Sequence, residues 1–245
     1  MTKEMKNEFT YNLDHSNYSN IPPFTGEMMF LLKNHHYGSF ETAVYTAIIG
    51  CALEIEHGNT HPLKLKLGYE TYLMHDIGKL GMSSEFLNFS GRYKPGMFDE
   101  MKKHSEEGAK LLQKLGFDVE VYKAVEFHHS NFNGGGYPDG EKKVAIPFHS
   151  RVIRIADSVN AFLTKFCEKE GGSGVYQDLD KWTGDWYDPN LIDSFESLHS
   201  KVMDACKKLG VSDPSQTVYM ERLIHLYSDS LPLKSVEEVE QHYSL

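Results

Sequence analysis

Histidine and aspartate residues gather in the middle of this 245-residue sequence, where their side chains could hold metal ions. Five of the 13 histidines fall between His75 and His149, among them the dipeptide His75-Asp76 and the adjacent pair His128-His129. Imidazole and carboxylate ligands without thiolate favour Fe, Mn, Zn or Ni over Ca or Mg. Two such ions about 3.5–4 Å apart can support hydrolysis of a phosphate ester, because one activates a water and the other offsets charge on the phosphoryl oxygens.

Two of the expected helices turn a histidine toward the core. A helix over 98–115 places His104 on the same apolar stripe as Leu112, and a helix over 118–129 places His128 on a stripe with Val125. A single buried histidine is usually a hydrogen-bonded core residue. Because several helices aim such groups inward together, and a metal would satisfy all of them, a metal centre is the stronger hypothesis.

The dipeptide His75-Asp76 has the geometry to serve two ions. A helix is expected from about Pro62 to Asp76, where adjacent residues point about 100° apart, so the imidazole can bind one ion while the carboxylate spans two. Lys79 lies one turn beyond His75 and, lacking a lone pair, would lie near the cluster without joining it. The alternative for Lys79 is a solvated surface lysine. Asp157 lies on the flank of a helix expected over 148–168, where burial of its carboxylate without a partner would cost free energy.

A glycine-rich run, Gly134-Gly135-Gly136-Tyr137-Pro138, follows the paired histidines. Glycine permits close approach of backbone to a ligand, and proline stiffens the end of the run. Tyr137 offers a phenolic donor and a stacking face. A flexible connector is the alternative, and the neighbouring histidine pair favours a ligand-binding loop.

Helical periodicity recurs along the chain and strand alternation is weak, so an all-α helical bundle is expected. The chain divides into an N-terminal arm, residues 1–25, and a single helical domain, residues 26–245. Residues 170–188 are expected to form a loop anchored by Trp182, Trp186 and Tyr187. The remaining helices are expected at 40–56, which is apolar on almost every side, and at 189–209, 214–229 and 235–243.

Composition limits the partners and the location of the chain. With 35 acidic residues against 25 Lys plus Arg, the formal charge is -10, which disfavours binding to duplex nucleic acid and leaves room for a small anionic substrate drawn by bound cations. Residues 1–12 lack a signal peptide, and the longest apolar stretch, 43–53, is shorter than the roughly 20 residues that span a bilayer. Three scattered cysteines indicate a reducing compartment. A cytoplasmic protein without a membrane segment is expected.

From about Asn34 to Phe195 the sequence resembles the HD-GYP subfamily of HD-domain metal-dependent phosphohydrolases. The resemblance is carried by an ordered series of motifs: His75-Asp76-Ile77-Gly78-Lys79, Lys94-Pro95-Gly96, His104 before Gly108, His128-His129, Gly136-Tyr137-Pro138, Ile146-Pro147, Arg151, Ala156-Asp157 and Tyr187-Asp188-Pro189. It implies an all-helical fold, two or three divalent metal ions, often Fe or Mn, and hydrolysis of cyclic di-GMP or a related cyclic dinucleotide by attack of metal-bound hydroxide.

The same resemblance assigns roles by matched position. Asp76 and Lys79 would be catalytic, with Lys79 on the scissile phosphate or the hydroxide, and Tyr137 would place the substrate together with Gly136, Pro138 and Lys169. The metal ligands would be His75, Asp76, His104, His128, His129 and Asp157.

The sequence departs from the family at the first core helix, where a further histidine ligand is usual. The nearest match is Glu41, which could bind metal through its carboxylate or could simply favour the helix start through the helix dipole. His35 and His36 could instead fold back onto the site.

Further departures lie on the helix after Asp157. Asn160 stands where a second aspartate is usual, and Phe166 stands where an arginine is thought to hold a substrate phosphate; loss of that guanidinium removes a bidentate partner. These departures support an alternative hypothesis: the chain is a degenerate member of the family that binds a cyclic dinucleotide or a protein partner with little or no catalysis. An enzyme acting on another nucleotide is a third hypothesis. A homodimer or a signalling partner is possible in each case.

Overall fold

The computed structural model describes residues 23–138, 140–165 and 172–245, and the described chain is all-α apart from one short strand pair. The all-α prediction is therefore confirmed. The elements are α2 (Pro23–His35), α3 (Tyr37–Glu56), α4 (Pro62–Leu73), η1 (Ile77–Gly81), α5 (Ser84–Leu87), α6 (Met97–Leu115), α7 (Val119–Glu126), β1 (His129–Ser130), β2 (Gly136–Tyr137), η2 (Lys143–Ala145), α8 (Phe148–Lys165), η3 (Gly172–Gly174), α10 (Val175–Asp180), α11 (Pro189–Lys208), α12 (Gln216–Tyr227) and α13 (Val236–His242).

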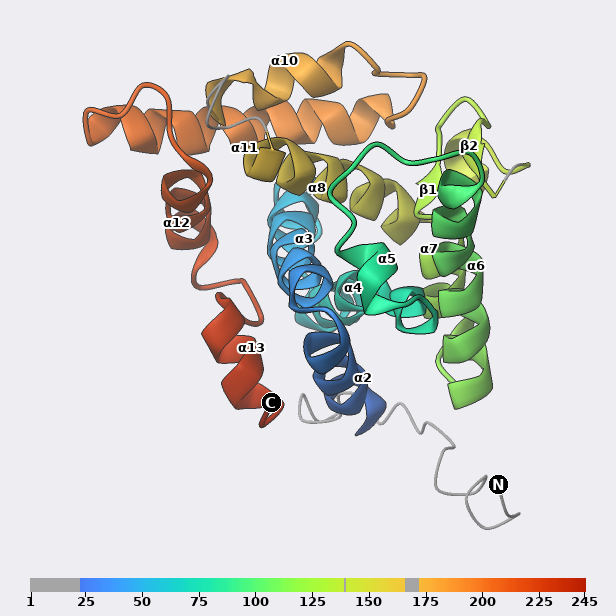
Figure 1. Ribbon diagram of the computed structural model, residues 1–245. Helices are drawn as coiled ribbons and strands as arrows, with labels where there is room; N and C mark the ends of the chain where they lie inside the picture. The colour runs from blue at the N-terminus through green and yellow to red at the C-terminus, as the bar shows by residue number, and fades with distance from the viewer. Residues whose placement is uncertain (1–22, 139, 166–171) are drawn as a thin grey trace.

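Helix α3 forms the centre of the core (Figure 1). Its residues from Ala43 to Glu54 are buried except Tyr45, as its all-round apolar sequence predicts. Helices α4 and α8 pack along it, and α2 and α11 also contact it. The helix begins three residues earlier than predicted, because His36 caps it by accepting the Ser39 amide.

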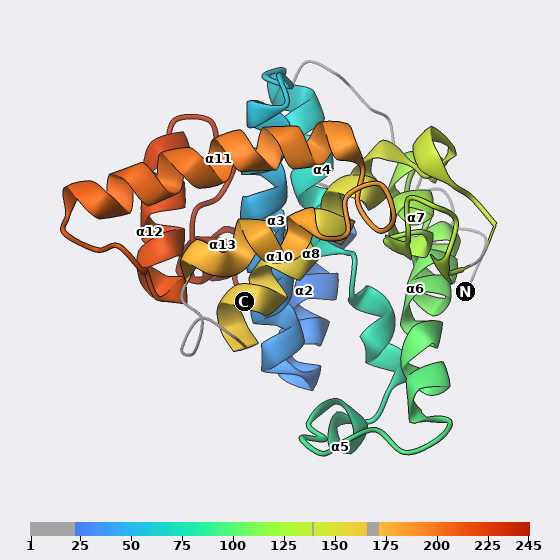
Figure 2. The same cartoon turned by 90° about the horizontal axis from the view of Figure 1, so that it is seen from above.

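The motif-bearing elements lie together on one side of α3. Helix α6 packs against η1 and α7, α7 packs against α4 and α8, and the antiparallel pair β1–β2 contacts α8 through β1. Figures 1 and 2 place α6 and α7 on one side of the molecule and α12 on the other. The candidate residues therefore converge from segments far apart in the sequence.

Two helices end earlier than predicted, and in both a histidine beyond the end bonds back to a carbonyl of the last turn. Helix α4 stops at Leu73 instead of Asp76, and α7 stops at Glu126 instead of residue 129. In a continuing α-helix the Tyr72 and Val125 carbonyls would accept amides four residues ahead. Here each carbonyl accepts the Nδ1–H of a histidine ring three residues ahead, His75 or His128. His104 makes the same bond to Met101 inside α6, which continues to Leu115, so this bond does not by itself end a helix.

Other boundaries follow the predictions closely. The helix expected over 98–115 begins at Met97 and ends before Gly116, whose φ of 83° closes it, and the three C-terminal helices lie where periodicity places them. The loop expected over 170–188 contains η3 and the short helix α10.

Part of the predicted N-terminal arm, residues 1–22, lies outside the described residues, as do Phe166 and Lys169, whereas residues 23–25 begin α2. Among the described helices none has the length and apolar composition to cross a membrane.

A buried ionic network ties α3, α4, α7 and α8 together. Glu54, with no exposed surface, accepts hydrogen bonds from the Tyr72 hydroxyl and the Asn59 amide. The ring of His149 lies 3.6 Å from Glu54 Oε1 through Nδ1 and 3.3 Å from Glu120 Oε1 through Nε2. Burial lowers the pKa of His149, but the bonds to Glu120 and Glu54 outweigh it and raise that pKa to about 9.

This network predicts a pH dependence of stability. Because the folded pKa of His149 exceeds the unfolded value of about 6.5, the contribution of His149 is complete below about pH 6.5 and is lost as the pH rises through about 9. The loss amounts to about 3 kcal/mol of unfolding free energy. Urea unfolding in EDTA measures the free energy of unfolding at pH 6 and pH 10. This free energy should fall more between the two pH values in the wild type than in His149→Gln. Parallel pH profiles for the two proteins would refute this assignment.

Candidate metal centre

Three histidines are fixed in one tautomer by the backbone. His75 Nδ1 donates to the Tyr72 carbonyl at 2.8 Å, His104 Nδ1 to Met101 at 2.6 Å and His128 Nδ1 to Val125 at 2.6 Å. A carbonyl only accepts, so each Nδ1 carries the hydrogen, and in the neutral ring Nε2 keeps its lone pair. Metal-ligating histidines commonly have this second bond to a carbonyl.

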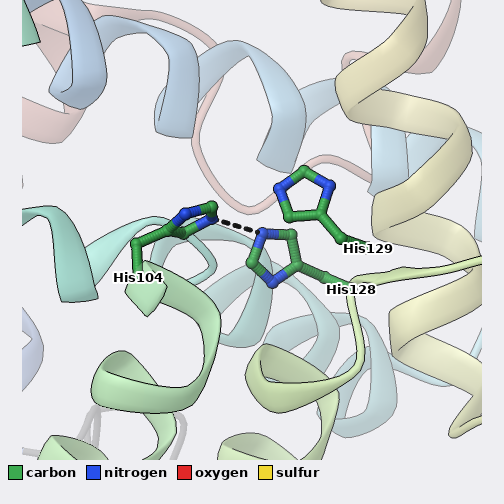
Figure 3. A group of neighbouring side chains, drawn as sticks. All are labelled: His104, His128 and His129. Atoms are coloured by element: carbon green, nitrogen blue, oxygen red, sulfur yellow. Dashed lines mark hydrogen bonds between the residues drawn. The ribbon is translucent and has the colours of Figure 1, made fainter. Parts of the chain in front are cut away.

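The free ring nitrogens face one buried space. His104 Nε2 lies 3.1 Å from His128 Nε2, and His75 Nε2 is buried without a hydrogen-bond partner among the described residues. Ligand atoms of His104, His128 and His129 all lie within 4.8 Å of one another (Figure 3). Two nitrogens each about 2.1 Å from one ion and at right angles would lie about 3.0 Å apart. The cluster therefore fits a metal ion.

Burial keeps most of this cluster neutral. It lowers the pKa of His128 well below the usual value, and His104 and His75 lower it further. The pKa of His129 is lowered in the same way, by burial first and then by His128 and His104. A neutral imidazole is the form that binds metal.

Asp76 faces two of the imidazoles at once. Its Oδ1 lies 3.3 Å from His104 Nε2 and its Oδ2 lies 3.4 Å from His75 Nε2. Burial raises the pKa of Asp76, but Lys79 and then His75 outweigh it and hold that pKa well below the usual range. The carboxylate is therefore charged and has one oxygen toward each side of the cluster, which supports the predicted bridging role.

Lys79 lies against the carboxylate of Asp76 rather than along the face of His75. The two residues are separated by one turn of the 3-10 helix η1, and Lys79 Nζ lies 2.5 Å from Asp76 Oδ2. Burial lowers the pKa of Lys79, and Asp76 outweighs it, so the pKa is raised. The ammonium is a fixed positive charge at the edge of the centre.

The glycine-rich run forms a hairpin that covers the centre. Residue Tyr137 pairs with His129 and Gly136 with Ser130, and the rings of Tyr137 and His129 lie 4.6 Å apart. A Cβ on Gly136 would lie 2.2 Å from the His129 carbonyl, so only glycine fits there. Ser130 Oγ donates to the Pro138 carbonyl at 3.2 Å, which closes the hairpin.

The remaining candidates divide into near and distant positions. Asp157 Oδ1 lies 4.0 Å from His75 Nε2. Glu41 instead acts electrostatically on Tyr37 and Tyr45, together with Glu237 of α13, and no interaction described for it reaches the cluster.

The alternative to Glu41 is the pair His35-His36, and His36 interacts electrostatically with residues of the centre. Burial lowers the pKa of His36, and the positive charge of Lys79 lowers it further, while the charge of Asp76 acts in the opposite direction. Nε2 of its neighbour His35 bonds the Met82 carbonyl at 2.7 Å. Asn160 Oδ1 accepts a hydrogen bond from Gln216 at 3.3 Å, so this amide is engaged with α12.

Sequence reasoning missed two residues beside the centre. The charge of Arg154 acts on His129 and Tyr137, and Tyr93 acts on Lys79 and Tyr137. Arg154 stands three residues before Asp157, one turn along the same helix, and that spacing could have revealed it. Tyr93 lies on an irregular segment without periodicity, so no sequence signal marks it.

Comparison with known proteins identifies the family of the chain. Residues 45–191 match the model of the HD domain family, so the chain belongs to that family. A cyclic di-GMP phosphodiesterase of Thermotoga maritima is 26% identical over 151 residues, 58% of this chain and 40% of the relative. A 3′3′-cGAMP-specific phosphodiesterase of Vibrio cholerae is 36% identical over 93 residues, 38% of this chain and 22% of the relative. The chain thus spans less than half the length of these relatives.

Two solved structures share the fold. A cyclic GMP-AMP-specific phosphodiesterase of Vibrio cholerae gives a TM-score of 0.55 at 18% identity, over 84% of this chain and 59% of that one. An HDG"Y"P protein from Bdellovibrio bacteriovorus gives a TM-score of 0.56 at 19% sequence identity, over 72% of this chain and 61% of that one.

A close backbone contact holds Asp76 beside the cluster. A Cβ on Gly78 would lie 1.9 Å from the His104 carbonyl and 2.6 Å from the Gly108 amide nitrogen. Helix α6 and η1 can therefore touch only because position 78 has no side chain, and this approach brings Asp76 to His104.

Gly78→Ala should separate η1 from α6. We expect a loss of about 1–3 kcal/mol of unfolding free energy from overpacking and weaker binding of Mn²⁺, measured by denaturant unfolding and by equilibrium dialysis. Gly81→Ala is the matched control, because a Cβ at this position of the same short helix meets nothing within 4 Å. Equal stability and Mn²⁺ affinity in the two variants would show that the contact does not position Asp76.

Proposed function

We propose that this chain is a metal-dependent phosphodiesterase that hydrolyses a cyclic dinucleotide, with cyclic di-GMP as the first candidate substrate. The observation that carries the proposal is the set of buried Nε2 atoms of His75, His104 and His128, which the Nδ1–carbonyl bonds turn toward the charged carboxylate of Asp76. The names of the curated relatives supply the substrate class.

The donor set suits two or three divalent cations, Fe or Mn first, because it combines imidazole and carboxylate without thiolate. When bound, such ions lower the pKa of a coordinated water and offset charge on phosphoryl oxygens. His75, His104, His128, His129 and Asp157 would hold them, and Asp76 would join two through its separate oxygens.

Lys79 would stabilise charge on the reacting phosphate. Its ammonium has three N–H donors, and Asp76 occupies one of them. The other two are available to phosphate oxygens at the edge of the centre. A fixed cation aimed at developing negative charge acts more strongly in a buried site than in water.

Tyr137 would place the substrate over the centre. Burial and the charge of Asp76 raise the pKa of its hydroxyl, so the phenol keeps its proton and can donate a hydrogen bond. The ring of Tyr137 lies 6.4 Å from the exposed ring of Phe98. The two aromatic rings would offer a nucleobase a stacking surface.

A binding protein without useful catalysis is the second candidate. Two departures from the family pattern favour it. The interactions described for Glu41 are with Tyr37 and Tyr45, and Asn160 accepts a hydrogen bond from Gln216, so neither side chain has a described contact with the candidate histidine ligands. Turnover separates the two candidates directly.

Protein loaded with Mn²⁺, or with Fe²⁺ without oxygen, should hydrolyse cyclic di-GMP or 3′3′-cGAMP, as followed by chromatography of the products. Lys79→Met should lower kcat about 10²–10³-fold through lost charge stabilisation, with metal content unchanged. Lys103→Met, on the exposed surface of α6, should match the wild type.

A His75→Ala/Asp76→Ala double variant sets the background of this assay. Wild-type turnover no higher than that background, with metal bound, would exclude the catalytic proposal. Tight binding of intact dinucleotide in the same preparation would then favour the binding protein.

A further inference from the structure

Arg154 carries a positive charge that no nearby carboxylate neutralises. It lies on α8, three residues before Asp157, and no carboxylate of the described chain comes within 4 Å of its guanidinium nitrogens, whereas Arg151 on the same helix pairs with Asp188. The described hydrogen bonds of Arg154 go to neutral groups. An uncompensated guanidinium is a ready partner for an anion.

The guanidinium is held in a fixed plane. Nε and one terminal nitrogen donate to Asn131 Oδ1 at 3.3 and 3.1 Å, and the other terminal nitrogen donates to Ser158 Oγ at 3.2 Å. Its carbon lies 5.2 Å from the ring centre of Trp186 and 5.5 Å from that of Tyr187. Of the five N–H donors of arginine, three are used, and one remains on each terminal nitrogen.

This group belongs to the surroundings of the metal centre. Its partner Asn131 follows β1 directly, and the Asn131 amide donates to the Gly135 carbonyl at 2.8 Å within the hairpin that carries Tyr137. Its charge also acts on His129 and on Tyr137. The guanidinium therefore lies beside the hairpin, whereas Lys79 contacts Asp76.

We propose that Arg154 is a substrate-positioning residue that binds the non-reacting phosphate of a cyclic dinucleotide through its two remaining N–H donors. This inference rests on the proposed function. A cyclic dinucleotide carries two phosphodiesters; the metal ions and Lys79 serve the reacting one, and the other needs a cation in a protein of net charge -10. A planar guanidinium fits two phosphate oxygens at once, which an ammonium does not.

The test compares Arg154→Gln and Arg154→Lys with Arg222→Gln, a control on α12 across the molecule (Figures 1 and 2). Binding of a hydrolysis-resistant phosphorothioate analogue of cyclic di-GMP to Mn²⁺-loaded protein is followed by tryptophan fluorescence and calorimetry. We expect Arg154→Gln to weaken binding at least tenfold and Arg154→Lys to be intermediate, with wild-type metal content. The ratio of kcat/KM for cyclic di-GMP to that for bis(4-nitrophenyl) phosphate, which has one phosphodiester, should fall to the same extent.

The outcomes separate the two proposals. If the Arg154→Gln variant binds the analogue as tightly as the wild type does, or turns over the dinucleotide equally fast, the role proposed for Arg154 is overturned and the proposed function still stands. A wild type that neither binds the analogue nor hydrolyses the dinucleotide overturns the proposed function, and the role of Arg154 falls with it.

Discussion

The candidate centre depends on the hydrogen bonds that His75, His104 and His128 donate from Nδ1 to the carbonyl three residues earlier in the chain. These bonds decide which ring nitrogen keeps a lone pair and where it points. Two of them lie just beyond the ends of α4 and α7, and the third lies inside α6. Lone pairs 3.1 Å apart repel unless a proton or a cation lies between them, so the fold itself creates a demand for positive charge.

The rest of the molecule holds these rings in place. The core helix α3 supports α4, and Tyr72 links the ionic network to the centre, because its hydroxyl donates to Glu54 while its carbonyl orients His75. On the other side, the contact between Gly78 and α6 brings Asp76 to His104. Rigid support of this kind is what a metal centre needs, because ligands displaced by even small distances lose affinity.

Sequence reasoning located most of the fold, and its errors in the fold are local. Apolar periodicity predicted α3, α6 and α8, and it predicted that His104 faces the core, because buried positions recur with the helical period. It extended α4 through Asp76, because apolar periodicity does not mark the residue at which a helix gives way to a 3-10 turn. For the same reason it placed Lys79 beside His75, whereas the 3-10 turn places it against Asp76. Neither the β1–β2 pair nor the contact between Arg154 and Asn131 was predicted, since two-residue strands have no measurable alternation and that contact spans 23 residues.

Direct location of the metal tests the central claim. Crystals of Mn²⁺-loaded protein, measured on both sides of the manganese absorption edge, should show an anomalous peak within about 2.0–2.3 Å of the Nε2 atoms of both His104 and His128, with Asp76 bound to the same ion or to a second one beside it. Manganese found only elsewhere, with these two rings still 3.1 Å apart and a proton shared between them, would contradict the account.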